Sequence, residues 1–256
     1  MARALLLLAA LALILAVSGC TQAPAAPTSP EPAPIQPAPG PQRIPEPVPE
    51  PPQPAPVAPA SGPPLKIKSL PLAISPLSAG RAGDLVFTQQ KLELDRILID
   101  YGFVIPANSA GPAKTNPQPT FIAPLGTKVR SLVDGIVVAM PTLWSNDLSI
   151  HVAADENSRY RYETEHIINP LVKIGDRVTA GQVIAEVSDY DSRNTPGYGL
   201  VEIGILFGGR QPEHLCPFQY LDPAINQSVQ QDLLAFYEAW NQYRGEALYN
   251  LSAYAV

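Results

Sequence analysis

The sequence predicts a mainly β protein, an antiparallel β-sandwich or compact barrel with one amphipathic helix at its C-terminal end. Short apolar runs recur between residues 96 and 207, and glycine or proline residues separate them. A helical period appears only in the segment after residue 223. Short strands at this spacing are typical of sandwiches and small barrels. The 192 residues from 65 to 256 are enough for one domain with a sizeable core.

Residues 1–19 predict a secretory signal. Arg3 is the only charge, residues 4–17 are apolar, and Ser18 and Gly19 are small. The segment resembles the lipobox of bacterial lipoproteins, which ends in a cysteine that is acylated and starts the mature protein. The resemblance implies a lipid anchor on Cys20 and a location in the bacterial cell envelope, outside the cytoplasm. A plain signal peptide and an uncleaved anchor helix are the alternatives, although 14 apolar residues are few for a membrane span.

Residues 20–64 follow as the anchor cysteine and a proline-rich tether. Eighteen of the 44 positions from 21 to 64 are proline. Proline fixes φ and lacks an amide donor, so this run cannot form sheet or continuous helix and favours extended polyproline II. At ~3.1 Å per residue, the tether reaches at most about 130 Å. It therefore indicates a function at a distance from the membrane, or a simple spacer.

Charge and cysteine content exclude some classes of function. Without residues 1–19 the chain has 16 basic and 23 acidic residues, a net charge of −7. An acidic domain is a poor match to nucleic acid or to anionic lipid. Cys216 is the only other cysteine, and with Cys20 acylated it has no partner for an intrachain disulfide.

Seven segments have the pattern of β-strands. In the first, Arg96–Ile105, Ile97, Ile99, Tyr101, Phe103 and Ile105 alternate on one face. The other six are Val129–Leu132, Ile136–Met140, Leu148–Val152, Arg159–His166, Gln182–Val187 and Leu200–Phe207. Residues 65–95 form an N-terminal extension, in which Leu65–Ile74 is either an added strand or a strap along the sheet.

The C-terminal segment, residues 223–256, predicts a helix over Ser228–Tyr243. Its apolar residues Val229, Leu233, Phe236, Trp240 and Tyr243 have helical spacing, and Ser228 and Gln231 have the spacing of a capping box. Packing of this helix on the sheet is the favoured interpretation. The alternative is an exposed helix that binds a partner through its aromatic residues.

Two blocks of sequence carry a resemblance to a known family. The first is Ile122–Val129 (IAPLGTKV) with Val133–Val137 (VDGIV), and the second is His166 with Val172–Ile184 (VKIGDRVTAGQVI). Together they resemble the lysostaphin/LytM-type zinc endopeptidase domain, which cleaves peptide cross-links in peptidoglycan. The resemblance covers about residues 96–222. It implies an antiparallel sandwich with a groove, of the duplicated hybrid motif type.

The second block also occurs in biotinyl and lipoyl carrier domains and in export adaptors. A carrier needs a lysine at a hairpin tip, but Glu186–Asp191 contains none. An adaptor needs a long helical hairpin between its half-motifs, and the stretch from Met140 to Leu171 is too short and too rich in strand residues. The endopeptidase-type fold is therefore favoured.

The resemblance also shows where zinc would be bound in that family. The family provides a His and an Asp from an H-x-x-x-D segment and a second His from an H-x-H strand. Here Asn116 and Thr120 stand at the first pair of positions, and Leu200 and Glu202 at the second. Neutral Asn and Thr are weak zinc ligands, and no His or Asp lies between Tyr101 and Val133 to replace them. We therefore expect neither metal nor cofactor, and no peptide hydrolysis of the family's type.

His166 matches a non-ligand histidine of the family, which helps to bind or activate the scissile carbonyl. The resemblance implies that it faces Glu202 across the groove, as a structural ion pair or as a hydrogen-bonding site for a muropeptide or glycan. Tyr160, Tyr162 and Tyr198 either line the groove edge or pack as ordinary strand residues. The candidate ligand-binding residues are therefore Asn116, Thr120, Tyr162, His166 and Glu202.

The remaining histidines give weaker signals. His151 alternates with Ile150 and Val152, which predicts that it lies on the wetter face of its strand. His214 and Cys216 form an H-x-C pair that is conceivable as part of a metal site. A half-buried histidine beside a buried apolar thiol is the favoured interpretation of that pair.

The resulting hypothesis is a lipid-anchored lipoprotein with a metal-free, non-catalytic LytM-like domain. Its expected contacts are the membrane through Cys20, and peptidoglycan or a cell-wall amidase through the domain. A zinc endopeptidase with an unusual ligand set is one alternative, and a spacer-and-cap protein without a ligand is the other. A measurement of zinc content distinguishes the hypothesis from the endopeptidase alternative. A measurement of binding to peptidoglycan distinguishes it from the spacer-and-cap alternative.

Overall fold

The computed structural model describes residues 62–107, 111–190, 192 and 195–253. The chain divides into two units, 1–56 and 57–256, and every described residue belongs to the second unit. The predicted signal segment, the predicted lipidation site Cys20 and nearly all of the tether lie outside the described residues. No helix in the described part of the chain has the length and apolar character needed to cross a membrane.

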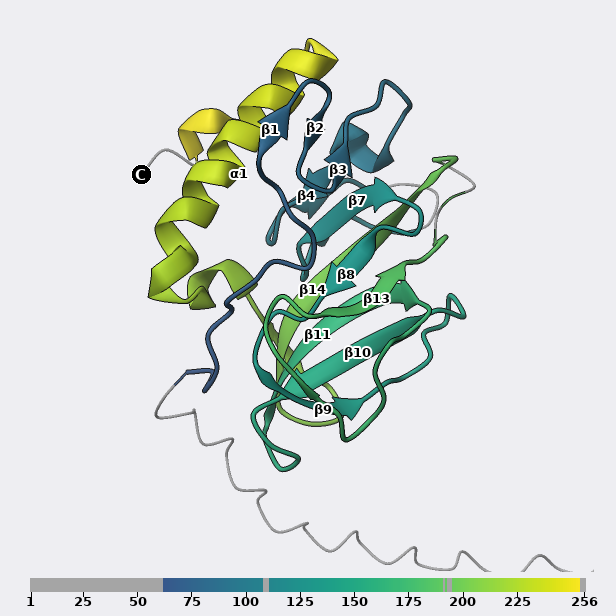
Figure 1. Cartoon of the computed structure of the whole chain (residues 1–256). Helices are drawn as coiled ribbons and strands as arrows, with labels where there is room; N and C mark the ends of the chain where they lie inside the picture. Colours follow the sequence, from purple (N-terminus) through teal and green to yellow (C-terminus); the bar gives the residue numbers. More distant parts are fainter. Residues whose placement is uncertain (1–61, 108–110, 191, 193–194, 254–256) are drawn as a thin grey trace, which may run out of the picture. The chain divides into compact units, whose positions relative to one another are not determined.

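A ten-stranded sheet forms the body of the domain (Figure 1). Seven strands follow in the order β12-β9-β10-β11-β14-β7-β4, β15 pairs with β14, and β13 pairs with both β11 and β8. Every pairing between these strands is antiparallel. The strands are β4 (Leu98–Ile99), β7 (Thr120–Pro124), β8 (Lys128–Arg130), β9 (Gly135–Ala139), β10 (Leu148–Ala153), β11 (Tyr160–Ile168), β12 (Arg177–Val178), β13 (Val183–Val187), β14 (Tyr198–Phe207) and β15 (Glu213–Leu215). The predicted class, mainly antiparallel β with a C-terminal helix, is confirmed.

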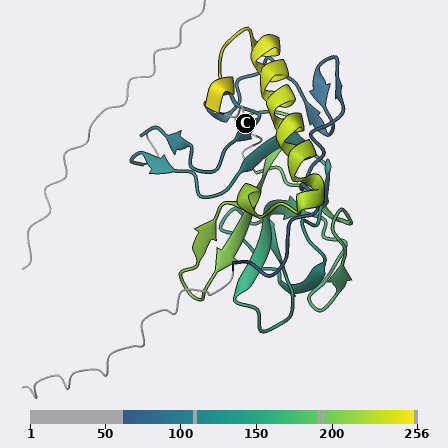
Figure 2. The same ribbon diagram turned by 90° about the vertical axis from the view of Figure 1, so that its left-hand side faces the viewer.

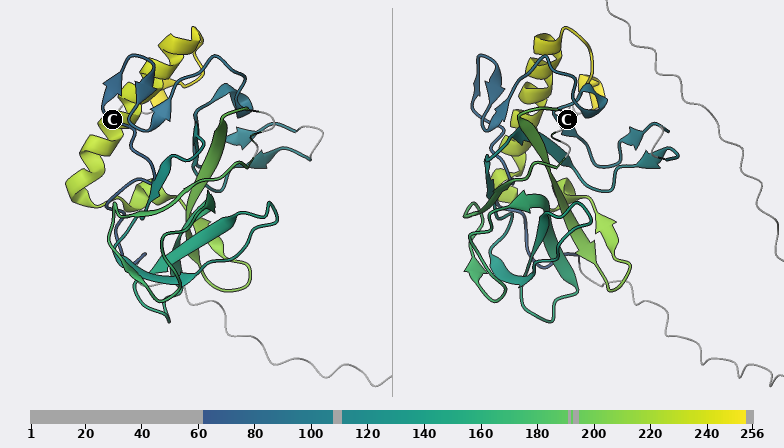
Figure 3. Two further views of the ribbon diagram at one scale, coloured as in Figure 1. Left: turned by 45° about the vertical axis from the view of Figure 1, so that its right-hand side comes forward. Right: turned by 90° about the vertical axis from the view of Figure 1, so that its right-hand side faces the viewer.

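Two small sheets lie before β7 in the chain, one on each side of β4 in sequence. One contains β1 (Leu77–Ser78), β2 (Arg81–Ala82) and β3 (Leu85–Val86), and the other contains β5 (Val104–Ile105) and β6 (Lys114–Thr115). The β5–β6 hairpin stands apart from the large sheet in both views of Figure 3. Three short 3₁₀ helices complete the list: η1 (Glu93–Asp95), η2 (Pro217–Tyr220) and η3 (Leu251–Ala253).

The prediction of one strand over Arg96–Ile105 is wrong. The chain forms β4, turns at Tyr101 and Gly102, and then forms β5 in another sheet. Gly102 adopts φ +79°, a left-handed conformation that glycine tolerates without a Cβ penalty. Alternation of apolar residues did not reveal this turn, because the apolar residues continue on both sides of it.

The N-terminal extension joins the same core as the large sheet. Leu72 and Ile74 are buried, and Ile67 forms a parallel bridge with Leu221 near the start of the C-terminal helix. The hydroxyl of Tyr162 donates a hydrogen bond to the Leu65 carbonyl and accepts one from the Leu65 amide. The extension therefore lies against the sheet as a strap held by a bridge and side-chain contacts.

Helix α1 (Pro223–Arg244) begins five residues before the predicted helix. Asp222 is its N-cap and accepts a hydrogen bond from the Ala224 amide, and Pro223 fits the first turn, where no amide donor is required. Gly245 ends the helix at φ 70°. The predicted cap at Ser228 is wrong, since the Ser228 hydroxyl donates within the helix to the Ile225 carbonyl.

One face of α1 is buried through Val229, Leu233, Phe236, Tyr237 and Trp240. Phe87, just after β3, contacts the ring of Trp240 edge-on with a centroid distance of 5.3 Å. Figures 1 and 2 show the helix running beside the β1–β3 sheet. The helical period in the sequence therefore marks a packed face, and the alternative of an exposed partner-binding face does not apply to these residues.

Gly199 allows a close approach of two backbone segments. It lies in β14 opposite Ala123, and an added Cβ would meet the Ser188 carbonyl oxygen at 1.9 Å. We expect Gly199→Ala to lower the free energy of unfolding by about 1–3 kcal/mol, measured by urea denaturation, since backbone atoms cannot move aside cheaply. Gly209→Ala is the control, because no atom lies within 4 Å of its added Cβ. Equal stability of the two variants would contradict the prediction.

Candidate functional site

His166 is near the C-terminal end of β11 and adopts a left-handed backbone conformation (φ 57°). Such a conformation is uncommon in residues other than glycine. Its Nε2 lies 3.9 Å from Oε2 of Glu202, which is paired across the sheet with Glu165, the neighbour of His166. Adjacent strand residues ordinarily point to opposite faces. We infer that the left-handed conformation turns the imidazole toward the face that carries Glu202.

Asp147 orients the His166 ring. Its Oδ2 lies 3.0 Å from Nδ1 of His166 and accepts a hydrogen bond from the Ser188 hydroxyl at 2.6 Å. Its Oδ1 accepts a bond from the Ser145 hydroxyl at 2.5 Å. A carboxylate held by two hydroxyls and facing Nδ1 fixes the ring orientation and directs Nε2 toward Glu202.

Glu202 closes the other side of the site. Its Oε1 accepts a hydrogen bond from the Thr120 hydroxyl at 3.1 Å, so the sheet brings together two positions that the sequence motif singled out. Burial raises the pKa of Glu202, the neighbouring His166 opposes that shift, and the negative charge of Glu165 adds to it. The gap of 3.9 Å between His166 and Glu202 exceeds hydrogen-bond length, so a ligand hydroxyl or amide has polar groups on both sides.

The arrangement does not have the geometry of a serine hydrolase. In a Ser-His-Asp triad the nucleophilic hydroxyl faces the imidazole nitrogen that the Asp does not bind. Here Ser188 and Ser145 both donate to Asp147, on the Nδ1 side of the ring. The group on the Nε2 side is the carboxylate of Glu202. The site therefore places hydrogen-bonding groups on both sides of the imidazole.

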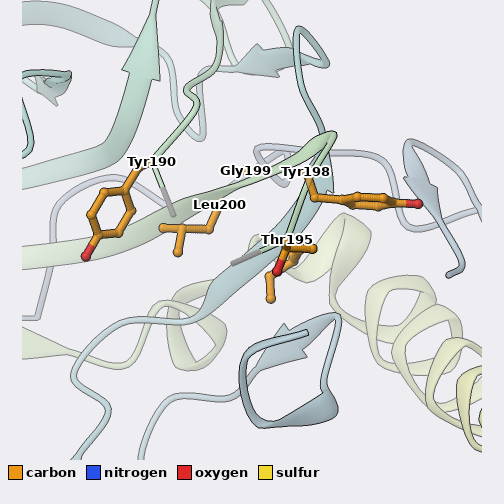
Figure 4. A pocket seen from close by; sticks show the side chains of 6 residues that line it. Tyr190, Thr195, Tyr198, Gly199 and Leu200 are labelled. Atoms are coloured by element: carbon orange, nitrogen blue, oxygen red, sulfur yellow. The ribbon is translucent and has the colours of Figure 1, made fainter. Parts of the chain in front are cut away.

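Two aromatic side chains extend the site toward solvent. Tyr190 stacks on His166 with a centroid distance of 4.0 Å and an interplanar angle of 6°. Trp144 contacts Tyr190 edge-on at 5.5 Å and is 81 % exposed. A pocket beside the stack is lined by Ile122, Tyr190, Thr195, Tyr198, Gly199 and Leu200 (Figure 4).

The residues at the family's zinc positions do not fit zinc. The Asn116 side-chain amide nitrogen has two protons and lies within hydrogen-bond distance of the carbonyl oxygens of Ile99, Asp100 and Gln118, so its amide has a structural role. The Thr120 hydroxyl has one proton, which is shared between the Gln118 carbonyl and Glu202. Among these motif positions only Glu202 carries a carboxylate, whereas a catalytic zinc ion requires three protein ligands.

Of the tyrosines singled out in the sequence, only Tyr198 reaches the site, as part of the pocket wall. Tyr162 is 1 % exposed and bonds Leu65 through its hydroxyl, which excludes the predicted role at the groove. Tyr160 packs against Phe207 at 4.6 Å. The Tyr198 hydroxyl donates to the Val86 carbonyl, and Figure 4 shows its ring pointing away from Tyr190. These three residues are part of the ordinary packing of the fold.

The other predicted groups have a mixed outcome. The prediction of a wet environment for His151 is wrong, because this residue is only 9 % exposed. Cys216 is a half-buried free thiol, and burial raises its pKa, which opposes a role as a nucleophile. His214 is half-buried, as expected, but its Nδ1 lies 3.6 Å from Glu163, a residue that the sequence motif did not single out.

Several residues of the site were not predicted from the sequence. Asp147, Ser188, Tyr190 and Trp144 lie in turns that pattern analysis does not place, and only the fold brings them to His166. Glu163 and Glu165 could have been found. Charged residues alternate with Tyr160, Tyr162 and Thr164 along β11, and this pattern indicates a strand with one polar face.

Comparisons with known proteins identify similar structures only. No family model matches the chain, and no curated protein matches it. The antimicrobial peptidase lysostaphin from Staphylococcus simulans is 19 % identical, with a TM-score of 0.39, over 48 % of each chain. A variant of the catalytic domain of the prophage-encoded M23 protein EnpA from Enterococcus faecalis is 22 % identical, with a TM-score of 0.36, over 46 % of this chain and 85 % of that one. Csd3 from Helicobacter pylori is 13 % identical, with a TM-score of 0.39, over 68 % of this chain and 43 % of that one.

These TM-scores lie below 0.5, and this chain spans less than half of lysostaphin and of Csd3. The resemblance to LytM-like domains concerns the β fold, and the chemistry of this chain follows from its own residues.

Proposed function

We propose that this chain is a lipid-anchored, extracytoplasmic lipoprotein whose LytM-like domain binds peptidoglycan without cleaving it. Three features support the proposal. The sequence blocks resemble a peptidoglycan endopeptidase family, the positions of that family's zinc ligands hold residues unsuited to zinc, and an aromatic stack adjoins polar groups at the same place. The proposal depends mainly on the last feature, because aromatic and polar side chains placed side by side can bind a ligand without catalysing a reaction.

The chemistry of the stack suits a muropeptide or glycan. Sugar rings have apolar faces that pack on indole or phenol rings, and their hydroxyls bond to nearby polar groups. Trp144 provides an exposed indole, and Tyr190 connects it to the His166 imidazole. Glu202 lies beside that imidazole, so apolar and polar contacts are available next to each other.

We expect Trp144→Ala to weaken binding of the full chain to purified insoluble peptidoglycan about tenfold or more, measured by co-sedimentation. An exposed tryptophan at the centre of a binding site commonly accounts for this much affinity. Leu77→Ala is the control, because Leu77 is also an exposed apolar residue but lies in β1. His166→Gln tests the polar part of the site and is expected to weaken binding as well.

Three outcomes would contradict the proposal. If Trp144→Ala and His166→Gln bind like the wild type, the site is not the binding surface. If the wild type does not co-sediment, the chain acts as a regulator of a wall hydrolase or amidase, or as a spacer. If new free amino groups appear in the peptidoglycan, the zinc endopeptidase alternative is favoured.

A further inference from the structure

A second cluster of polar side chains lies on the sheet, beside the site of His166 and Glu202. Glu163 of β11 is flanked in register by His151 of β10 and by Gly204 of β14. Directly opposite residues in antiparallel strands share one face of the sheet. Glu165 lies two residues further along the same face, and β15 adds His214 at the far side of β14. Four residues with metal-binding side chains therefore lie together: His151, Glu163, Glu165 and His214.

The distances within the cluster suit a bound metal ion. One ligand atom from each of His151, Glu163 and Glu165 can be chosen such that all lie within 4.8 Å of one another. His151 Nε2 is 3.7 Å from Oε2 of Glu163, and His214 Nδ1 is 3.6 Å from Oε1 of Glu163. Two ligands of a tetrahedral zinc ion with bonds of ~2.0–2.1 Å are about 3.4 Å apart. The two His–Glu163 distances are close to this value, and the Glu165 oxygen has to move toward the other ligands by more.

The imidazoles of the cluster lack hydrogen-bond partners. His151 is nine-tenths buried, its Nδ1 has no partner among the described residues, and its Nε2 faces Glu163 beyond hydrogen-bond length. The Nδ1 atom of His214, which faces the same carboxylate, is also buried without a partner in that part of the chain. Buried polar atoms are ordinarily paired, so the unpaired Nδ1 of His214, which faces Glu163, indicates a missing ligand. His151 faces the same carboxylate through Nε2, at a distance too long for a hydrogen bond.

The position of Glu163 depends on a glycine. A Cβ at position 204 would meet Oε1 of Glu163 at 2.3 Å, so the carboxylate occupies the space that a side chain of β14 would take. The side-chain amide of Gln118 donates to Glu163 at 3.0 Å and to Glu165 at 3.2 Å. This amide bridges the two carboxylates and holds them close together.

The charge of the cluster is not balanced by basic residues. Among the described residues, no lysine or arginine forms an ion pair with Glu163, Glu165 or Glu202. Imidazole and carboxylate groups are ligands that zinc prefers, and a bound cation would offset the negative charge that gathers there.

We propose that His151, Glu163 and Glu165, with His214 as the fourth donor, bind one zinc ion at a position displaced from the family's catalytic site. Imidazole and carboxylate ligands suit zinc. Four protein donors would complete its coordination, which is typical of a structural site that ties β10, β11 and β15 together. This inference is independent of the proposed binding function, because none of these four residues belongs to the aromatic stack.

The test is a zinc titration of the full chain after dialysis against a chelator. Isothermal titration calorimetry measures the binding. We expect one zinc per chain and a rise in Tm on binding. Glu163→Gln is the main variant, because it keeps the size of the side chain but removes the anionic ligand, and we expect about 100-fold weaker binding or more. His151→Gln provides a second variant in case the first does not fold, and far-UV circular dichroism checks both.

Two controls locate the zinc ion. Cys216→Ser is expected to bind zinc like the wild type, which excludes the free thiol, and Trp144→Ala is expected to do the same. Absorption of the cobalt-substituted chain should show four-coordinate nitrogen and oxygen ligands. No binding by the wild type, or equal binding by the wild type, Glu163→Gln and His151→Gln, would overturn the inference. Peptidoglycan co-sedimentation is measured separately, so either proposal can fail alone.

Discussion

Trp240→Ala is expected to lower the free energy of unfolding by about 3–5 kcal/mol, the usual range for removing a large buried aromatic side chain. Trp240 is fully buried in α1, contacts Phe87 edge-on, and donates from its indole nitrogen to the Asp95 carbonyl at 3.1 Å. The substitution leaves a cavity between α1 and the residues after β3. It also leaves that carbonyl without its partner. Urea denaturation measures the loss.

Trp144→Ala is the matched control for this experiment. The chain has two tryptophans, and Trp144 is 81 % exposed in a turn before β10. Its removal should change the free energy of unfolding by no more than about 0.5 kcal/mol. Similar effects of the two substitutions would contradict the packing of α1 against the N-terminal extension.

The metal-free chain is expected to become less stable as the pH rises from 7 to 9. The pKa of Glu163 is raised from its ordinary 4.5 to about 9 in the folded state, so the folded state binds this proton more tightly than the unfolded state. The stabilisation is complete below about pH 4.5 and is lost as the pH rises through about 9. One proton gives a slope of up to about 1.4 kcal/mol per pH unit. Chemical denaturation in the presence of a chelator measures the slope.

Glu163→Gln is expected to reduce this slope, because an amide does not titrate. His151 does not contribute above pH 7, because its pKa is lowered from 6.5 to about 4 and the ring is neutral in both states there. Glu156→Gln, at an exposed loop position, is the control. A flat stability profile of the wild type over this pH range would contradict the burial of an uncompensated carboxyl group.

Much of the fold was predictable because it depends on local patterns. Alternation placed strands at β9, β10, β11, β13 and β14, and a helical period placed α1. The errors occurred where tertiary contacts compete with local pattern. The apolar run Arg96–Ile105 divides between two sheets, and α1 begins at Pro223 because Asp222 caps it.

Residues of the candidate site could be predicted only where they occupy a position of the sequence motif. Counting along the motif gave Thr120, His166 and Glu202, and the structure brings these three together. It also gave Asn116, whose side chain has a structural role. The strand pattern predicts Tyr162 at the groove, but in the structure its hydroxyl bonds Leu65. Asp147 and Tyr190 have no motif, because their contacts with His166 depend on how turns from distant parts of the chain meet.

Residue type and spacing along the chain were enough to place most strands and the helix. They also put Asn116, Thr120 and Leu200 at positions where the resembled family has His or Asp. Which polar groups share a face follows from strand pairing in the folded chain. Register places His151 beside Glu163, and the absent side chain of Gly204 leaves room for that carboxylate. Burial of the cluster shifts its pKa values, and burial is a property of the folded chain alone.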